Sequence, residues 1–262
     1  MPSLSPLGEL VRRHDPDRFL CALFAPARQR ETLFLLYAFN HELARAREVA
    51  TQPTLALIRL QWWREVVEGA RRRHEVAGPL GAALDAGRLN PADLAAMIEG
   101  REAEAEAAIP TLADWERYVG AIAGGVAVTA GRALEADEPM LRRLQALGTA
   151  YGMAGQLRSV VALARQGRCQ LPEDVLAAHG LTVHEVIADP RSARLAPVLQ
   201  VLAEHGRRRL CDTRGPVPRR ALAAALPAVL ARRDLARVGR AIRPRGISDR
   251  LAVVVAGLAA RV

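Results

Sequence analysis

The sequence predicts an all-α protein whose residues 1–262 form a single domain. Ala and Leu dominate the apolar residues and Arg and Glu dominate the charged ones, and all four are strong helix formers. No stretch sustains the period-2 alternation of β-branched residues that is typical of strands. Half of the residues are hydrophobic, so the chain has enough apolar mass for one large core. We found no internal repeat, linker or low-complexity tract, and we expect roughly ten helices.

In the first half of the chain, prolines, glycines and capping residues set the helix limits. Asn90–Pro91 is the clearest signal, because Asn accepts an orphan N–H and Pro fits the first turn. The first predicted helix begins at Asp15 or Asp17 and ends at Leu23, and the second covers 27–50. The third begins at Pro53–Thr54 and is broken at Gly78–Pro79, after which a short helix continues to Leu89. The fifth begins at Asn90 and ends before Pro110.

In the second half, a glycine-containing helix is predicted first, with Gly120, Gly124 and Gly125 inside it. Each glycine should cost up to ~1 kcal/mol relative to Ala, so glycines at this place indicate close helix contact or room for a ligand. This glycine-containing helix begins at Thr111 or Asp114, and the next predicted helix covers 139–165. A short helix then extends from Pro172 to His179–Gly180. Two more helices cover 192–209 and 219–242, and a last helix ends the chain.

The long helix containing residues 32–48, TLFLLYAFNHELARARE, is the most informative one. One side carries Leu33, Leu36, Tyr37, Asn40, Ala44 and Glu48 at helical spacing, and it turns from apolar to polar at Asn40. Buried polar groups need partners and occur mostly where a site exists. The alternative interpretation is an amphipathic helix whose last two turns emerge into water.

Composition bounds the compartment and the partners. No Lys occurs, so Arg carries all 37 positive charges, and the formal net charge of +9 favours acidic partners. No recognition motif accompanies the arginine clusters, so we expect no nucleic acid. Three scattered cysteines indicate a reducing compartment, and the first twenty residues lack the apolar run of a signal peptide. We therefore expect a cytoplasmic protein, with peripheral contact at the inner membrane as the other placement.

Common catalytic motifs are absent from the sequence. It contains no P-loop, no GxSxG and no GxGxxG between a strand and a helix. His41–Glu42 starts like a helical zinc site, but Arg45 stands where the second His would be.

Three segments together resemble the squalene/phytoene synthase family: LYAFNHELARAREV, IRLQWWREVVEG and YGMAGQLRSVVALARQGRCQLPEDVLAAHGL. In the third segment the family has a characteristic order, which we call the family frame: a long helix, then a basic loop, then Leu-Pro. The residues of this chain that fit the family frame are Gln156, Arg158, Arg165, Gly167, Arg168, Leu171 and Pro172. The resemblance implies an isoprenoid-synthase fold, a helical bundle with a central cavity. It also implies head-to-head condensation of two prenyl diphosphates, with Mg²⁺ held by carboxylates at i and i+4 on two facing helices.

The family's aspartate pairs are missing. In the first motif helix their positions fall at Ala44 and Glu48, and in the second at Ser159 and Leu163. No register shift restores an acidic i, i+4 pair in either helix. We therefore expect no catalytic residues, no metal ligands and no cofactor, and Mg²⁺ only if the chain is nevertheless an active prenyltransferase.

AFNHELARAREV, RLQWWREVVE, IEGREAEAE and LPEDVLAAHG are similar to a non-catalytic branch of this family, which contains assembly factors for respiratory complex I. This resemblance implies a non-catalytic scaffold, and the all-Arg composition together with the absence of a transit-peptide pattern indicates a bacterial relative. Its partner would be a respiratory subunit or assembly intermediate, and an isoprenoid-like lipid is a further candidate ligand. The alternative is an active prenyltransferase that uses Glu48, Arg158 and Arg168. The predicted cavity or partner-binding residues are Asn40, Ala44, Glu48, Arg59, Gln61, Arg64, Arg101, Gln156, Arg158 and Ser159.

One geometric expectation follows from the resemblance: Asn40, Ala44, Glu48, Gln156 and Ser159 should face one another across a shared interior space. The arginines of the second segment have two interpretations. In the structural one, Arg59 or Arg64 pairs with Glu48 or Glu65; in the functional one, they belong to a basic or polar patch that meets a partner.

Overall fold

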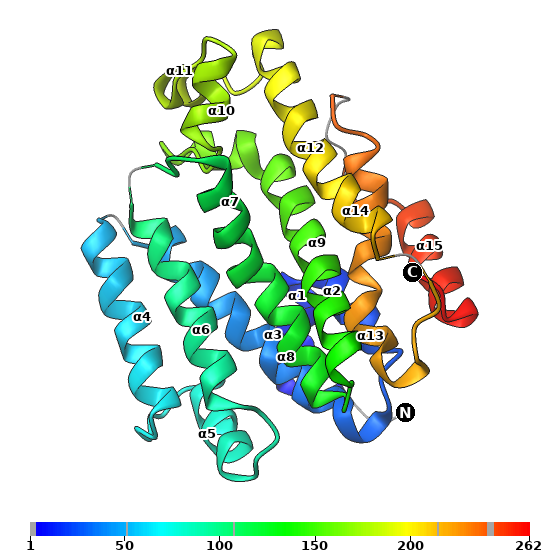
Figure 1. The fold of residues 1–262 in the computed structure, drawn as a ribbon. Helices are drawn as coiled ribbons and strands as arrows, with labels where there is room; N and C mark the ends of the chain where they lie inside the picture. Colours follow the sequence, from blue (N-terminus) through cyan, green and yellow to red (C-terminus); the bar gives the residue numbers. More distant parts are fainter. Residues whose placement is uncertain (1–3, 51, 107, 214, 240–243) are drawn as a thin grey trace.

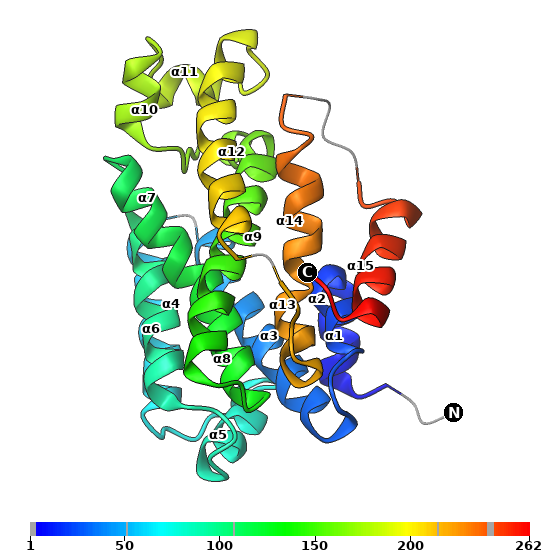
Figure 2. The same cartoon turned by 45° about the vertical axis from the view of Figure 1, so that its right-hand side comes forward.

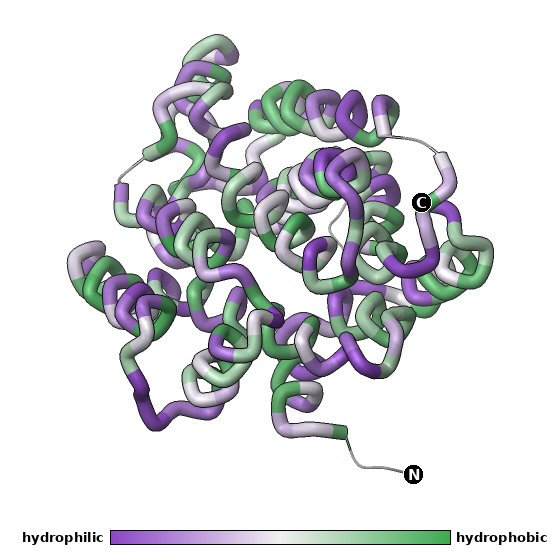
Figure 3. The backbone as a smooth tube through the Cα atoms, turned by 60° about the horizontal axis from the view of Figure 1, so that its bottom comes forward, coloured by the Kyte–Doolittle hydropathy of each residue, from purple (hydrophilic) through white to green (hydrophobic). Residues whose placement is uncertain are grey.

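The computed structural model describes residues 4–50, 52–106, 108–213, 215–239 and 244–262 (Figure 1). Helices account for the regular structure of these residues, which contain no β-strand, so the predicted all-α class is confirmed. The helices are amphipathic, with hydrophilic and hydrophobic residues alternating along their turns (Figure 3). None of the described helices is long and apolar enough to cross a membrane.

In the N-terminal part, several helices begin as the sequence predicts, with a proline in the first turn. Asn90 caps its helix by accepting from the N–H of Ala92 at 2.9 Å, and Asp15 likewise accepts from Arg18 at 3.0 Å. The helices are α1 (Pro6–His14), α2 (Pro16–Ala22), α3 (Ala27–Glu48), α4 (Pro53–Val67), α5 (Ala77–Asp85) and α6 (Pro91–Glu102).

Two details of this part differ from the prediction. Helix α1 was not predicted, although Ser5 caps it and Pro6 opens it. The predicted break at Gly78–Pro79 lies instead inside the first turn of α5. Pro79 is tolerated there because the first backbone N–H groups of a helix have no intrahelical acceptor.

The glycine-containing helix forms, but it contains a π-helical turn. Helix α7 (Leu112–Val119) continues through Gly120–Gly124, where the helix is π, into α8 (Gly125–Ala133). Helix α9 (Glu138–Ala164) packs directly on this turn. A Cβ on Gly148 of α9 would lie 2.7 Å from the carbonyl oxygen of Ala123. The glycines here therefore allow close helix contact.

The C-terminal part contains α10 (Glu173–Ala178), α11 (Val183–Ala188), α12 (Ala196–Cys211), α13 (Leu222–Ala225), α14 (Pro227–Leu235) and α15 (Ile247–Ala259). Helix α11 was not predicted, although Thr182 and Glu185 form a capping box for it. The predicted helix over 219–242 is broken, because Pro227 starts α14 and its ring cannot continue the preceding helix. The predicted end at Ile242 lies outside the described residues.

Helix α9 is the centre of the arrangement. It packs against the π-helical turn and α8 on one side and against α12 and α14 on the other (Figure 1). Helix α3 packs on α1, α4 and α8, and α15 lies at the outer edge against α14 and α2 (Figure 2). The two helices that carry the family-like motifs, α3 and α9, therefore both contribute to the interior.

Candidate functional site

A buried carboxylate, Glu104, is the centre of the polar interior. It lies in the 3₁₀ turn Ala103–Ala105 directly after α6, and it is 8% exposed. Arg101 Nη1 donates to its Oε1 at 2.6 Å, and the hydroxyl of Tyr118 donates to the same oxygen at 2.7 Å. Arg168 Nη2 lies 3.6 Å from Oε2. A charged and a neutral donor therefore both bond to Oε1, and Arg168 supplies a positive charge close to Oε2, so the buried carboxylate is compensated.

The contacts continue to both motif helices. On one side, Arg101 Nη2 donates to Asn40 Oδ1 on α3 at 3.3 Å. On the other side, Gln156 Nε2 on α9 donates to the Tyr118 hydroxyl at 3.4 Å. Asn40 and Gln156 are thus linked through other side chains. We call this set the Glu104 network; it comprises Asn40, Arg47, Arg101, Glu104, Tyr118, Gln156 and Arg168.

The network holds one carboxylate, Glu104, and three guanidinium groups, those of Arg47, Arg101 and Arg168. Burial opposes the charge of Arg101, but Glu104 outweighs this effect, so the pKa of Arg101 is raised. For Arg168, burial prevails over the attraction of Glu104 and the pKa is lowered. Burial, followed by the charge of Glu104, raises the pKa of Tyr118 well above its usual value, so Tyr118 stays a neutral donor.

One polar atom of the network is unsatisfied. Gln156 Oε1 is buried and accepts no hydrogen bond from the described residues. Arg47 bonds to the backbone of Glu104 and not to its side chain: the Nε of Arg47 donates to the carbonyl oxygen of Glu104 at 3.2 Å. This bond holds the 3₁₀ turn against α3.

The residues present do not fit a cluster of Mg²⁺ ions. Ala44, Ser159 and Leu163 occupy three of the four aspartate positions of the family frame, and neither Ala nor Leu offers an oxygen ligand. Glu48 is exposed at the end of α3. Glu104, the buried carboxylate nearby, is already paired with two arginines and a tyrosine. Among the described residues, no group of three or more His, Cys, Asp or Glu side chains is placed to hold a metal ion.

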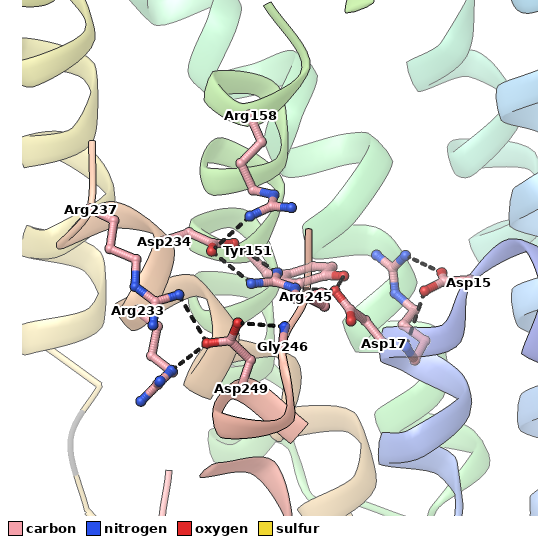
Figure 4. Close-up of polar contacts among 11 residues, drawn as sticks. Asp15, Asp17, Tyr151, Arg158, Arg233, Asp234, Arg237, Arg245, Gly246 and Asp249 are labelled. Atoms are coloured by element: carbon pink, nitrogen blue, oxygen red, sulfur yellow. Dashed lines mark hydrogen bonds and ion pairs between the residues drawn. The ribbon is translucent and has the colours of Figure 1, made fainter. Parts of the chain in front are cut away.

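Arg158, another predicted site residue, belongs to a second buried cluster (Figure 4). Its Nη1 donates to Asp234 Oδ1 at 3.2 Å. Arg245 donates to both oxygens of Asp234, at 2.6 and 2.7 Å, and to Asp17 Oδ2 at 2.9 Å. This second cluster ties the segment before α15 to α2, α9 and α14, so its geometry is structural.

The other predicted residues on α4 lie away from the Glu104 network. Arg64 Nη2 pairs with Glu102 at 2.5 Å, and Glu65 pairs with Arg72. The expected pairing of Arg64 with Glu48 or Glu65 is therefore wrong, because α6 brings Glu102 against α4. Arg59 and Gln61 are exposed on the surface of α4.

A small interior cavity of about 10 Å³ lies between the central helices. Arg18 lines this cavity. Its guanidinium carbon lies 5.8 Å from the ring centre of Tyr37 and 5.0 Å from that of Tyr151. Asp15 forms an ion pair with Arg18 at 2.8 Å. A cavity of this volume holds about one water molecule.

Sequence reasoning found Asn40, Arg101 and Gln156, and Arg168 under the alternative function, but it missed Arg47, Glu104 and Tyr118. Glu104 lies in the acidic run EAEAE, where nothing in the sequence distinguishes it from Glu102 or Glu106. Tyr118 shares one face of its helix with Trp115, Ile122 and Val126, and membership of an apolar face does not single it out. A sequence signal for its role in the network was nevertheless present, because a tyrosine on a buried helix face needs a hydrogen-bond partner for its hydroxyl.

Comparison with known proteins places these features in a family. The profile of the squalene/phytoene synthase family matches residues 11–253. One similar solved structure is a dehydrosqualene synthase, with a TM-score of 0.79 and 16% identity, covering 97% of this chain and 94% of that one. Another is squalene synthase HpnC from Alicyclobacillus acidocaldarius, with a TM-score of 0.68 and 20% identity, covering 88% of this chain and 90% of that one. At these identities the structural likeness shows the fold alone.

Similar curated proteins carry a different kind of name. "NADH dehydrogenase (ubiquinone) complex I, assembly factor 6" of Bos taurus is 25% identical over 205 residues, which cover 74% of this chain and 60% of that protein. The human protein is 42% identical over 60 residues, 23% of this chain and 18% of that protein. The Drosophila melanogaster homolog is 27% identical over 198 residues, which cover 68% of this chain and 57% of that protein. The chain thus spans at most about 60% of the length of these relatives.

Proposed function

The chain belongs to the squalene/phytoene synthase family, and from this premise we propose that it is a non-catalytic scaffold that assists assembly of a respiratory NADH dehydrogenase complex. Its partner is a subunit or an assembly intermediate of that complex. It acts on the cytoplasmic side, in peripheral contact with the inner membrane.

The observation that carries the proposal is the use of Glu104 inside the protein. Ionisation of a prenyl diphosphate needs positive charge at the leaving group, which Mg²⁺ supplies when several carboxylates hold it. Here the buried carboxylate faces Arg101 and Arg168, and the frame positions at Ala44 and Leu163 have no oxygen. The engagement of Glu104 by arginines supports a structural use of this carboxylate and not a metal-binding one.

The small cavity beside Arg18 does not offer room for a prenyl chain. With a volume of about 10 Å³ it is far below the 300–1,000 Å³ typical of ligand pockets. Arg18 and two tyrosines fill the space between the central helices there, so a prenyl chain does not fit at that place.

The role in assembly rests on the relatives. Three of them are named for assembly of complex I, and the bovine and fly proteins align over more than two thirds of this chain. Exposed polar residues of α4, Arg59 and Gln61, together with the partly exposed Arg64, are the proposed partner contact.

A second candidate function, prenyl transfer, is favoured by the match of residues 11–253 to the squalene/phytoene synthase family. Its residual groups would be Glu48, Arg158 and Arg168. Two of these are already engaged, since Arg158 pairs with Asp234 and Arg168 lies against Glu104. We therefore rank it second.

Two experiments separate the candidates. The purified protein is incubated with farnesyl or geranylgeranyl diphosphate and Mg²⁺ or Mn²⁺, and we expect no squalene or phytoene. In parallel, the gene is deleted in the organism that encodes it, and we expect less assembled NADH dehydrogenase on native gels, restored by the intact gene. Metal-dependent turnover that Glu48→Ala abolishes, together with normal complex levels in the deletion strain, would establish the prenyltransferase instead.

A further inference from the structure

A surface groove between α3 and α4 lies outside the Glu104 network. It encloses about 420 Å³, within the range typical of small-ligand sites. Its apolar lining includes Val49, which is 45% exposed, and Ile58, which is 61% exposed. We call it the α3–α4 groove. Exposed apolar side chains that line a concave surface indicate a binding site.

The aromatic wall of this groove is held in place by ring contacts. The rings of Trp62 and Trp63 meet edge to face with centres 4.8 Å apart, and His74 packs on both at 5.7 and 5.3 Å. Phe39 of the core supports Trp63 from behind at 5.4 Å. A wall anchored in this way is formed before any ligand arrives, which reduces the entropy lost on binding.

The groove carries one net positive charge. Glu42 and Arg45 neutralise each other at 3.1 Å. Arg59 is exposed, and it makes no hydrogen bond or ion pair with the described residues. The Nδ1 atom of His74 accepts from the N–H of Val76 at 3.1 Å, so a neutral ring carries its proton on Nε2. The unpaired guanidinium of Arg59 therefore determines the sign of the ligand charge.

We propose that the α3–α4 groove binds a single-chain anionic amphiphile, with its carboxylate on Arg59 and its apolar chain along Trp62 and Ile58. One guanidinium matches one carboxylate, bidentate and with balanced charge, whereas a phosphate monoester carries up to two negative charges. An apolar chain covers the exposed lining, which a small inorganic anion leaves in water. The groove shares Arg59 with the proposed partner contact on α4, and it lies apart from the small cavity beside Arg18.

The protein contains an internal reporter for this test. Of its three tryptophans, Trp62 and Trp63 line the groove, whereas Trp115 is fully buried elsewhere. The purified full-length chain is titrated with dodecanoate that carries bromine at the chain end, below its micelle concentration. We expect saturable quenching of about two of the three tryptophans. We also expect unbrominated dodecanoate to compete, and dodecanol and acetate to bind at least tenfold more weakly.

Matched substitutions locate the site. Arg59→Gln removes a charge-assisted hydrogen bond, so we expect at least about tenfold weaker binding of dodecanoate and no change for dodecanol. Ile58→Asp should abolish quenching. The controls are Arg142→Gln, an exposed arginine on α9, and Leu258→Asp, where the leucine is 72% exposed on α15, and both should bind like the original chain. Melting curves verify that each variant is folded.

Several results would overturn the proposal. They are the absence of saturable quenching, equal affinity for dodecanol and dodecanoate, or binding that neither Arg59→Gln nor Ile58→Asp weakens. Dissociation of a self-associated form by Ile58→Asp without any ligand quenching would instead assign the groove to a second copy of this chain.

Discussion

The hydroxyl of Tyr118 donates a hydrogen bond of 2.7 Å to the carboxylate of Glu104, and this contact joins α7 to the turn after α6 in the protein interior. Through it the two motif helices are connected, since Asn40 reaches Glu104 by way of Arg101 and Gln156 reaches it by way of Tyr118. The following predictions test the two buried clusters, the close helix packing and the proposed function.

Glu104→Gln should destabilise the fold strongly. Arg101 and Arg168 would lose their shared counter-charge, and breaking a buried pair on one side costs about 3–5 kcal/mol. Urea unfolding followed by circular dichroism measures the loss. Glu106→Gln, at an exposed position two residues later, is the control and should stay within about 0.5 kcal/mol. Equal stability of the two variants would remove Glu104 from its central role.

Restoring the aspartates of the family frame should recover metal binding before turnover. The variant carries Ala44→Asp, Glu48→Asp, Ser159→Asp and Leu163→Asp, which returns oxygen ligands to both motif helices. Calorimetric titration with Mg²⁺ should show binding for the fourfold variant and much weaker binding for Ala44→Asp alone. Product formation from farnesyl diphosphate should recover later than metal binding, because turnover also requires a surrounding pocket that matches the substrate. Turnover by the fourfold variant would show that only the ligands had been lost.

Arg64→Glu should weaken partner capture more than it weakens the fold. Its present partner Glu102 is 42% exposed, and exposed ion pairs contribute at most about 1 kcal/mol, so the melting temperature should change by only a few degrees. Capture is measured as NADH dehydrogenase subunits recovered with the tagged chain from membranes. Arg12→Glu on α1, where Arg12 pairs with Glu9, is the matched charge reversal and should capture normally. A large fall in stability of Arg64→Glu would make Arg64 a structural residue.

Gly148→Ala should destabilise the contact between α9 and the π-helical turn. The added Cβ would lie 2.7 Å from the carbonyl oxygen of Ala123, and overpacking of this kind typically costs about 1–3 kcal/mol. Gly155→Ala on the same helix is the control, because nothing lies within 4 Å of its Cβ position. That change should stabilise the protein by about 0.4–1 kcal/mol. A stabilising Gly148→Ala would contradict the close approach seen here.

Asp249 should make stability fall in acid. Burial opposes its charge, but hydrogen bonds from Arg233, the N–H of Gly246 and Arg237 outweigh burial and lower its pKa to about 2. The folded pKa is below the unfolded value of about 4, so the stabilisation is full above pH 4 and is lost as the pH falls toward 2. It amounts to about 2 kcal/mol.

Asp249→Asn checks this assignment. The variant should be less stable at neutral pH by about that amount, and its stability should change less than that of the original chain between pH 4 and pH 2. Unfolding by urea at several pH values gives both quantities. An unchanged pH profile would mean that other carboxylates account for the acid sensitivity.

Much of the helical structure follows from local signals in the sequence. Asn90 and Pro91 start α6 because a cap and a first-turn proline act within four residues. Such signals do not depend on the rest of the molecule. Pro227 is one too, and it should have ended the predicted helix over 219–242; we missed the break because the apolar pattern continues on both sides of it.

The interior contacts needed the tertiary structure. Helical periodicity places Asn40 with the polar side of its helix, because it fixes which side chains share a face. The resemblance to the family frame identifies the two motif helices and marks Ala44 and Leu163 as positions where carboxylates are replaced. The sequence did not determine that Glu104 rather than Glu102 enters the interior, or that Glu102 rather than Glu48 meets Arg64. Those choices depend on how α6 lies against α4 and α7. The free energies of exposed alternatives within one acidic run are nearly equal until packing removes one carboxylate from water.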